Sequence, residues 1–173
     1  MTNFLLLWYN SRMSNSDISY ILPNIYISNC KTANNEELLK KYNITSIINI
    51  SNSCVNNYYG HIDYNRLSIK SNYSKKRLYK YINIISADID GMHNRIINGH
   101  NILVHCRHGI QRACMYVAVY LMKYYNYNMK DVLEFIKSKR PIAFFRKNKY
   151  EFLLKEIEKK FMINKLNNNF NLN

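Results

Sequence analysis

The residues best suited to chemistry lie together in residues 105–112, which read HCRHGIQR. Cys106 directly follows a short apolar run, and Arg112 comes later in the stretch, with Gly109 between them. A chain that wraps from a strand end into a helix start can direct successive backbone N–H groups inward, where they bind an anion. The positive helix N-terminus favours an ionised sulfur at the base of this loop, and the planar guanidinium of Arg112 suits two phosphate oxygens. The stretch therefore predicts that Cys106 is a thiolate nucleophile facing a bound phosphoryl group.

The elements that must position this stretch alternate between strands and helices. Apolar and β-branched runs predict strands at residues 25–28, 46–50, 62–69 and 101–105. Apolar residues at helical spacing predict helices at residues 32–41, 77–98, 113–124, 129–139 and 149–161. The alternation predicts an α/β fold: a single domain with a central, mainly parallel twisted sheet flanked by helices. We expect an amino-terminal arm at 1–17, the domain at 18–162 and a frayed, Asn-rich tail at 163–173.

The composition bounds the class of protein. With 173 residues, of which 47% are hydrophobic, the chain suits one folded domain and is too apolar for a disordered segment. No stretch approaches the ~20 apolar residues that a bilayer span needs, so we expect none. The opening apolar run, residues 4–9, is short and follows no Lys or Arg, so we expect no signal peptide either.

The four cysteines give no pattern of their own. Cys30, Cys54, Cys106 and Cys114 form no CxxC pair and no Cys/His ligand spacing, so we expect no metal site and no cofactor. So sparse a set does not resemble a disulfide framework, which favours free thiols in a reducing compartment such as the cytoplasm.

The charge is strongly basic. The chain has 25 Lys and Arg against 11 Asp and Glu, a net charge of +14. Such a field attracts polyanions such as nucleic acid, anionic lipid or phosphorylated protein. The alternative interpretation is base composition, because Asn, Ile, Lys and Tyr dominate the chain.

The loop is similar to the signature of the cysteine-dependent phosphatases, in which a His-Cys pair follows a strand and an Arg stands six positions after the Cys. Residues 18–51 resemble the opening segment of the dual-specificity phosphatases, and residues 120–122 and 137–142 also match that family. The resemblance covers about residues 18–160. Within the family, the compact size and the composition are most similar to a poxvirus or insect-virus enzyme, which would work in the host cytoplasm or the virion.

The resemblance implies a dual-specificity phosphatase-like fold and a two-step reaction on phosphorylated protein, at phosphotyrosine and also phosphoserine or phosphothreonine. Cys106 would attack phosphorus to form a cysteinyl-phosphate, which water then hydrolyses, with no cofactor or metal. The phosphate oxygens would be bound by the loop, that is by Arg107, His108, Gly109, Ile110, Gln111 and Arg112. The viral resemblance also suggests a homodimer through the apolar residues 5–8 of the arm; the alternative is an arm folded on its own core.

Two features of the family are missing. Ala113 stands where active members have Ser or Thr, so we expect slower breakdown of the intermediate. The stretch expected to carry the general acid, residues 67–74, has no carboxylate; Asp63 lies on the preceding strand, and Asp88 and Asp90 fall on the long helix, where we expect them to be solvated. Loss of general acid catalysis costs about 10²–10⁴ in rate. The sequence therefore predicts weak activity that favours phosphotyrosine, aryl phosphates or phosphoanhydrides.

Two alternatives stay open. His108 makes the loop resemble that of RNA 5′-triphosphatases, which cleave a phosphoanhydride without the Asp, and the +14 charge suits RNA. The two missing features also fit a catalytically weak, phosphate-binding pseudophosphatase. We treat the similarity of residues 147–150, KNKY, to a phosphotyrosine-recognition motif as coincidence, because they follow the loop instead of preceding it.

Overall fold

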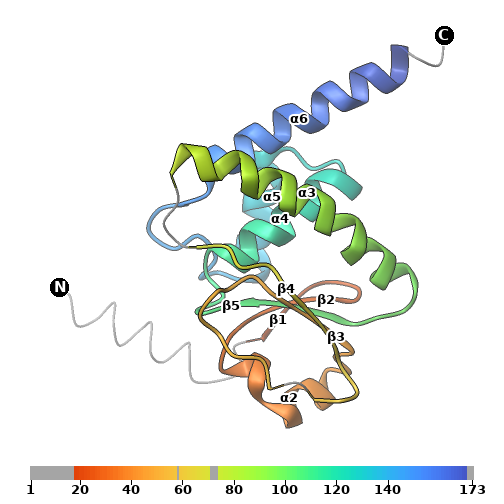
Figure 1. Ribbon diagram of the computed structural model, residues 1–173, viewed down its shortest axis with the longest axis vertical. Coiled ribbons are helices and arrows are strands. Elements are labelled where there is room, and N and C mark those ends of the chain that lie inside the picture. The colour runs from red at the N-terminus through yellow and green to blue at the C-terminus, as the bar shows by residue number, and fades with distance from the viewer. Residues whose placement is uncertain (1–17, 58, 71–73, 171–173) are drawn as a thin grey trace.

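The computed structural model describes residues 18–57, 59–70 and 74–170 (Figure 1). The strands are β1 Ile18–Leu22, β2 Ile25–Asn29, β3 Ser46–Asn49, β4 Asp63–Arg66 and β5 Ile102–Cys106. The helices are α2 Glu36–Lys41, α3 Lys75–Ile97, α4 Arg112–Tyr124, α5 Met129–Lys139 and α6 Glu151–Phe170, with a 3₁₀ turn, η1, at Thr32–Asn34. None of the helices within these ranges has the length and apolarity needed to cross a membrane.

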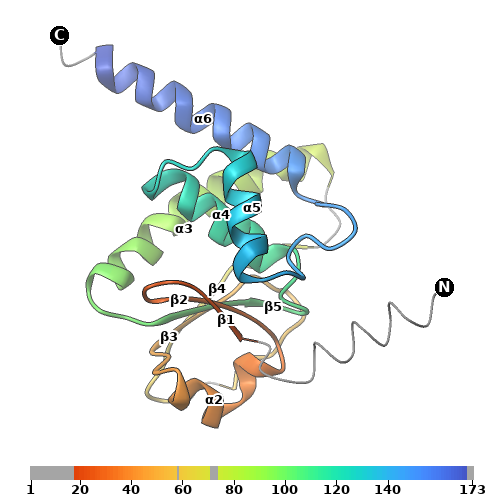
Figure 2. The ribbon, with the colours of Figure 1, turned by 180° about the vertical axis from the view of Figure 1, so that it is seen from behind.

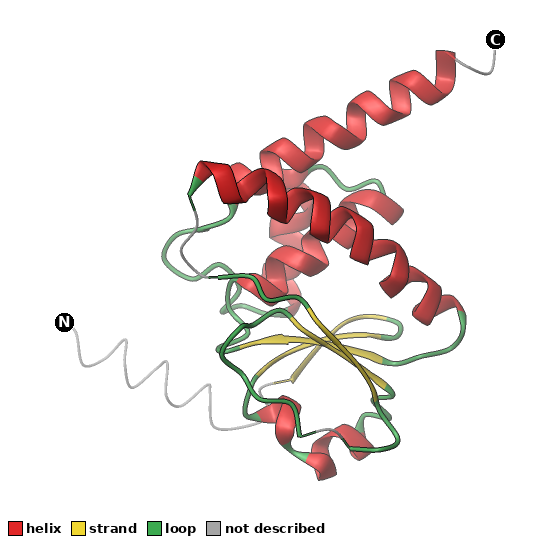
Figure 3. Cartoon of the chain, in the orientation of Figure 1, coloured by secondary structure: helices red, strands yellow, loops and turns green. Residues whose placement is uncertain are grey.

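The five strands form one sheet in the order β1-β2-β5-β3-β4. β1 pairs antiparallel with β2, and the other three pairings are parallel. α3, α4, α5 and α6 gather on one face of the sheet, and α2 covers the other (Figures 2 and 3). The predicted α/β architecture with a mainly parallel sheet is confirmed. β5 is the central strand, so the residues that follow it lie at the carboxyl end of the sheet, between the ends of β2 and β3.

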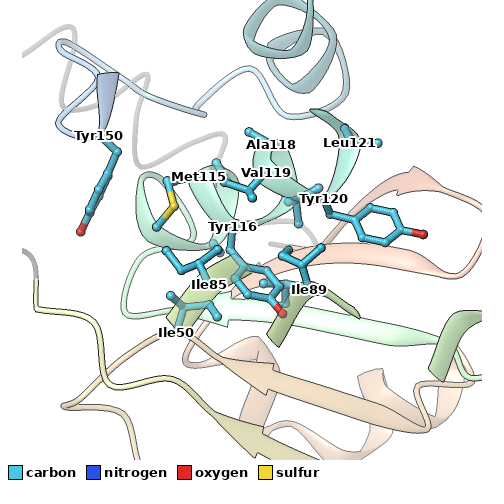
Figure 4. Packing of buried hydrophobic residues seen from close by; sticks show 14 of the residues in the cluster. Ile50, Ile85, Ile89, Met115, Tyr116, Ala118, Val119, Tyr120, Leu121 and Tyr150 are labelled. Carbon is cyan, nitrogen blue, oxygen red and sulfur yellow. The ribbon is translucent and has the colours of Figure 1, made fainter. Parts of the chain in front are cut away.

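The two faces of β5 belong to different hydrophobic clusters, because side chains alternate along a strand. Ile102, Val104 and Cys106 belong to the large cluster beneath α3 and α4, whereas Leu103 belongs to the smaller cluster on the α2 side. In the large cluster, Tyr116 of α4 lies between side chains of α3 (Figure 4). The alternation places His105 on the α2 side of the sheet, opposite Cys106.

Several boundaries differ from those predicted. The strand β1 was not predicted, and the strand predicted at 62–69 is only Asp63–Arg66, because β4 is an edge strand that pairs with the four residues of β3. The helix predicted at 32–41 divides into η1 and α2, and Asn35 instead of Thr32 caps α2 by accepting from the Leu38 amide at 3.1 Å. α6 extends past Phe161 to Phe170, into the stretch expected to fray. The expected arm lies outside the described residues.

Candidate active site

Cys106 and Arg112 lie at the two ends of the loop that follows the central strand, β5, at the carboxyl end of the sheet. Cys106 is the last residue of β5 and is 3% exposed, and Arg112 is the first residue of α4 and is 8% exposed. β5 ends there because its neighbours β2 and β3 end as well, at Asn29 and Asn49. The chain must therefore turn directly from the strand into the helix, which places the sulfur beneath the N-terminus of α4.

The carbonyl groups of this loop are bonded to the structure that surrounds it. The Arg107 oxygen accepts from the Cys30 amide at 3.3 Å, and the Ile110 oxygen accepts from the Phe144 amide at 2.8 Å. The Gly109 oxygen accepts from Arg140 Nε at 2.7 Å and from Cys114 Sγ at 3.4 Å. In a trans peptide the C=O and the next N–H point in opposite directions. Because these carbonyls point outward, the N–H groups of residues 108, 110 and 111, which follow them, point to the concave side of the loop.

Gly109 is required at its position. Its φ is +64°, in the left-handed region that side chains disfavour. A Cβ added there would lie 2.5 Å from the Ser28 carbonyl oxygen and 2.6 Å from Nη2 of Arg140. Arg140, itself 3% exposed, also donates to Ser19 Oγ at 3.0 Å, so this arginine joins the loop to β1. The loop is thereby held from behind by buried polar contacts.

The guanidinium of Arg112 is held in place from the segments that follow β3 and β4. Its Nη1 donates to the Ile69 carbonyl at 3.1 Å and to Ser51 Oγ at 3.5 Å. Ser51 Oγ also accepts from the Cys54 amide at 3.3 Å, which fixes the turn after β3. Both bonds from Arg112 use one terminal nitrogen, so they orient the guanidinium without using the edge formed by Nε and Nη2. That edge suits two phosphate oxygens.

A cavity of about 110 Å³ opens above the sulfur. Its lining residues are Cys106, His108, Ile110, Gln111, Arg112, Lys149 and Tyr150. Gln111 holds the segment after α5 in place, because its Nε2 donates to the Lys147 carbonyl at 2.9 Å and its Oε1 accepts from the Lys149 amide at 3.2 Å. Arg107 lies on the loop but not in the cavity lining, and its side chain is exposed.

Lys149 and Tyr150 are the lining residues that the sequence interpretation did not include. Tyr150 is fully buried, and its hydroxyl donates to the Lys70 carbonyl at 3.3 Å. Residues 147–150 follow the loop in the chain, but the chain returns after α5, so that Lys149 and Tyr150 line the same cavity as Cys106. The bonds of Gln111 to this returning segment are the local contact that positions them.

A family model described as the dual specificity phosphatase catalytic domain matches residues 25–160. The chain belongs to this family. Human dual specificity protein phosphatase 18 is 33% identical over 127 residues, which are 73% of this chain and 65% of that protein. Human dual specificity protein phosphatase 1 is 30% identical over 122 residues, which are 70% of this chain and 32% of that protein. The matched segment therefore spans between about a third and two thirds of these relatives.

Solved structures of the family share the fold of this dual specificity phosphatase domain. A mouse putative dual specificity phosphatase superposes with a TM-score of 0.75 at 20% identity, covering 86% of this chain and 90% of the mouse chain. Human DUSP28 gives a TM-score of 0.74 at 18% identity, covering 85% and 96% of the two chains.

The three aspartates considered as general acids for this dual specificity phosphatase domain are Asp63, Asp88 and Asp90. All three form ion pairs or hydrogen bonds with residues that do not line the cavity. Asp63 pairs with Arg95 at 2.7 Å. Asp90, on α3, pairs with Lys123 of α4 at 2.5 Å. Asp88 is not solvated as expected: it is half-buried and accepts from Asn65 Nδ2 at 2.6 Å and from the Tyr116 hydroxyl. Within the described residues, no Asp or Glu lines the cavity.

His105 precedes the sulfur and is almost fully buried, at 1% exposed. Burial is the main cause that lowers the pKa of its imidazole to about 4, and the charges of Arg66 and Arg112 act in the same direction. The ring is therefore neutral near pH 7. Ala113 is also fully buried and offers no hydroxyl to the loop.

Proposed function

We propose that this domain hydrolyses phosphate monoesters on proteins through a cysteinyl-phosphate. Cys106 attacks phosphorus, so that a sulfur–phosphorus bond forms while the bond to the leaving oxygen breaks. Water then attacks the same phosphorus, which releases inorganic phosphate and returns the thiolate. The observation that carries the proposal is the buried sulfur beneath a loop whose carbonyls are bonded outward, with the Arg112 guanidinium held beside it.

The substrate that fits best is phosphotyrosine, with phosphoserine and phosphothreonine turned over more slowly. A phenol leaves more readily as an anion than an alcohol does, so it depends less on a donated proton. The described residues of the cavity lining include no carboxylate to supply one.

The test is a panel of an aryl phosphate, a phosphotyrosine peptide and a matched phosphoserine peptide. We expect release of phosphate in that order of rate and loss of release in Cys106→Ser. Turnover that survives Cys106→Ser in a folded variant would overturn the mechanism.

A second candidate function is removal of phosphate from triphosphate-ended RNA. It is favoured by the lining without a carboxylate, since a phosphoanhydride needs no proton donor, and by the net charge of +14. The matched family and relatives favour protein substrates instead. Adding this RNA to the panel separates the two, because release from RNA alone would support the triphosphatase. Binding of phosphopeptide without release from any substrate would support a pseudophosphatase.

We also infer that the chain is of the poxvirus or insect-virus type, acts in the host cytoplasm or the virion, and forms a homodimer through its arm. The abundance of Asn, Ile, Lys and Tyr supports the viral origin. All four cysteines are free thiols, in keeping with a reducing compartment. Residues 1–17 lie outside the described residues, so the dimer is tested by light scattering of the full chain and of a chain that begins at residue 18.

A further inference from the structure

Three side chains that can bind a metal meet on the α2 side of the sheet, opposite Cys106. Cys30 follows β2, Cys54 lies in the turn after β3, and His105 is the penultimate residue of β5. One ligand atom from each, two sulfurs and an imidazole nitrogen, lies within 4.8 Å of the other two. The adjacent carboxyl ends of three neighbouring strands bring them together.

One nitrogen of this cluster is buried without a hydrogen-bond partner in the described part of the chain, which costs free energy of folding. Nδ1 of His105 is buried and has no hydrogen-bond partner among the described residues. A buried polar atom in a native structure normally has a partner, so this nitrogen is available to bind an ion. Cys54 is 4% exposed, while Cys30 is half-buried and leaves one side of the cluster open to solvent.

We propose that Cys30, Cys54 and His105 bind a zinc ion, with water as the fourth ligand. Two thiolates and one imidazole are donors that zinc prefers, whereas magnesium and calcium select oxygen. Bond lengths of about 2.3 Å to sulfur and 2.0–2.1 Å to nitrogen set ligand atoms about 3.5–3.8 Å apart in a tetrahedron. The observed limit of 4.8 Å is within reach of small side-chain rotations.

The surrounding charge is compatible with a divalent ion. Arg107 acts on Cys30, and Arg66 and Arg112 act on His105, so the cluster lies in a positive environment. Zinc displaces one proton from each of two thiols, and therefore leaves the net charge of the cluster unchanged. A cation bound without deprotonation of the thiols would instead add two charges beside three arginines.

The metal site would stabilise the phosphate-binding loop from the α2 side of the sheet. The amide of Cys30 donates to the Arg107 carbonyl, so a metal at the Cys30 sulfur joins this loop contact to β5 and to the turn after β3. The ligands come from distant parts of the chain, which is why the spacing of cysteines in the sequence gives no sign of the site. The role is structural, and no step of the proposed hydrolysis passes through the ion.

The test uses the full-length chain after treatment with a chelator, with Co²⁺ as the probe. We expect one Co²⁺ per chain, with a thiolate-to-cobalt charge-transfer band and tetrahedral ligand-field bands, both removed by one equivalent of Zn²⁺. Cys30→Ser and Cys54→Ser should each weaken binding at least tenfold. Cys106→Ser and Cys114→Ser are the matched controls, and we expect them to retain the bands.

Two results would overturn the site. One is a cobalt spectrum without thiolate bands in the folded wild-type chain. The other is a spectrum that Cys106→Ser abolishes and Cys30→Ser leaves intact, since that would place the metal at the candidate active site. Circular dichroism checks the fold of each variant. If Cys54→Ser fails to fold, the half-buried Cys30→Ser decides the question.

Discussion

The loop between β5 and α4 lines the cavity, whereas the segment after β4 contacts two of the lining residues, and the two differ in what they offer a substrate. The loop presents a sulfur, a helix N-terminus and an oriented guanidinium. The segment after β4 contributes backbone carbonyls: Ile69 accepts from Arg112, and Lys70 accepts from Tyr150. The groups suited to binding phosphate are therefore present, whereas no carboxylate of the described residues lines the cavity to protonate a leaving group.

The largest expected effect is complete inactivation by iodoacetate, an anion that the loop should bind. We expect the reagent to alkylate Cys106 first at pH 7, and phosphate or vanadate to protect it. Burial raises the pKa of Cys114 to about 12, so this thiol remains protonated. Peptide mass spectrometry gives the order of labelling. Labelling of Cys114 before Cys106 would contradict the phosphate-binding assignment.

Arg112→Lys should lower kcat/KM for an aryl phosphate by about 10²–10³, the loss measured when one preorganised donor to an oxyanion is removed. A lysine keeps the charge but cannot form the planar two-nitrogen contact. Arg95→Lys, which changes an arginine on α3, should change kcat/KM less than twofold. Equal losses in the two variants would mean that the cavity is not the reaction site.

Local patterns explain how much of this could be predicted from the sequence. Asn128 caps α5 by accepting from the Asp131 amide at 2.9 Å, and Pro141 follows the helix, so its predicted bounds, 129–139, are those observed. The Cys106-to-Arg112 loop was also recognisable because its residues are contiguous. Tyr150 could not be placed beside Cys106, and the cluster of Cys30, Cys54 and His105 could not be foreseen, since both depend on how distant segments pack.

Ala113→Ser should speed hydrolysis of the cysteinyl-phosphate about tenfold, the low end of what one hydrogen bond to a charged group contributes. Ala113 is fully buried next to Arg112, so a hydroxyl there can reach the loop. The measurement is the ratio of burst to steady-state rate with an aryl phosphate. Ala118→Ser, a buried position five residues farther along α4, is the control and should not change this ratio. An unchanged ratio in Ala113→Ser would show that breakdown of the intermediate does not limit turnover.

The smallest expected effect comes from returning a carboxylate to the segment after β4. Lys70 is exposed, and its carbonyl accepts from the hydroxyl of Tyr150, which lines the cavity, so Lys70→Asp adds a carboxylate on the segment that contacts the cavity wall. We expect turnover of the phosphoserine peptide to rise severalfold relative to the phosphotyrosine peptide, because the alcohol gains more from a donated proton. Lys76→Asp, exposed on α3, makes the same charge change away from the cavity and should leave the ratio of the two rates unaltered. A rise in both variants would attribute the effect to net charge. A rise in Lys70→Asp alone would show that proton donation is what the segment lacks, and a flat ratio would mean that the chemical step is not limited by the leaving group.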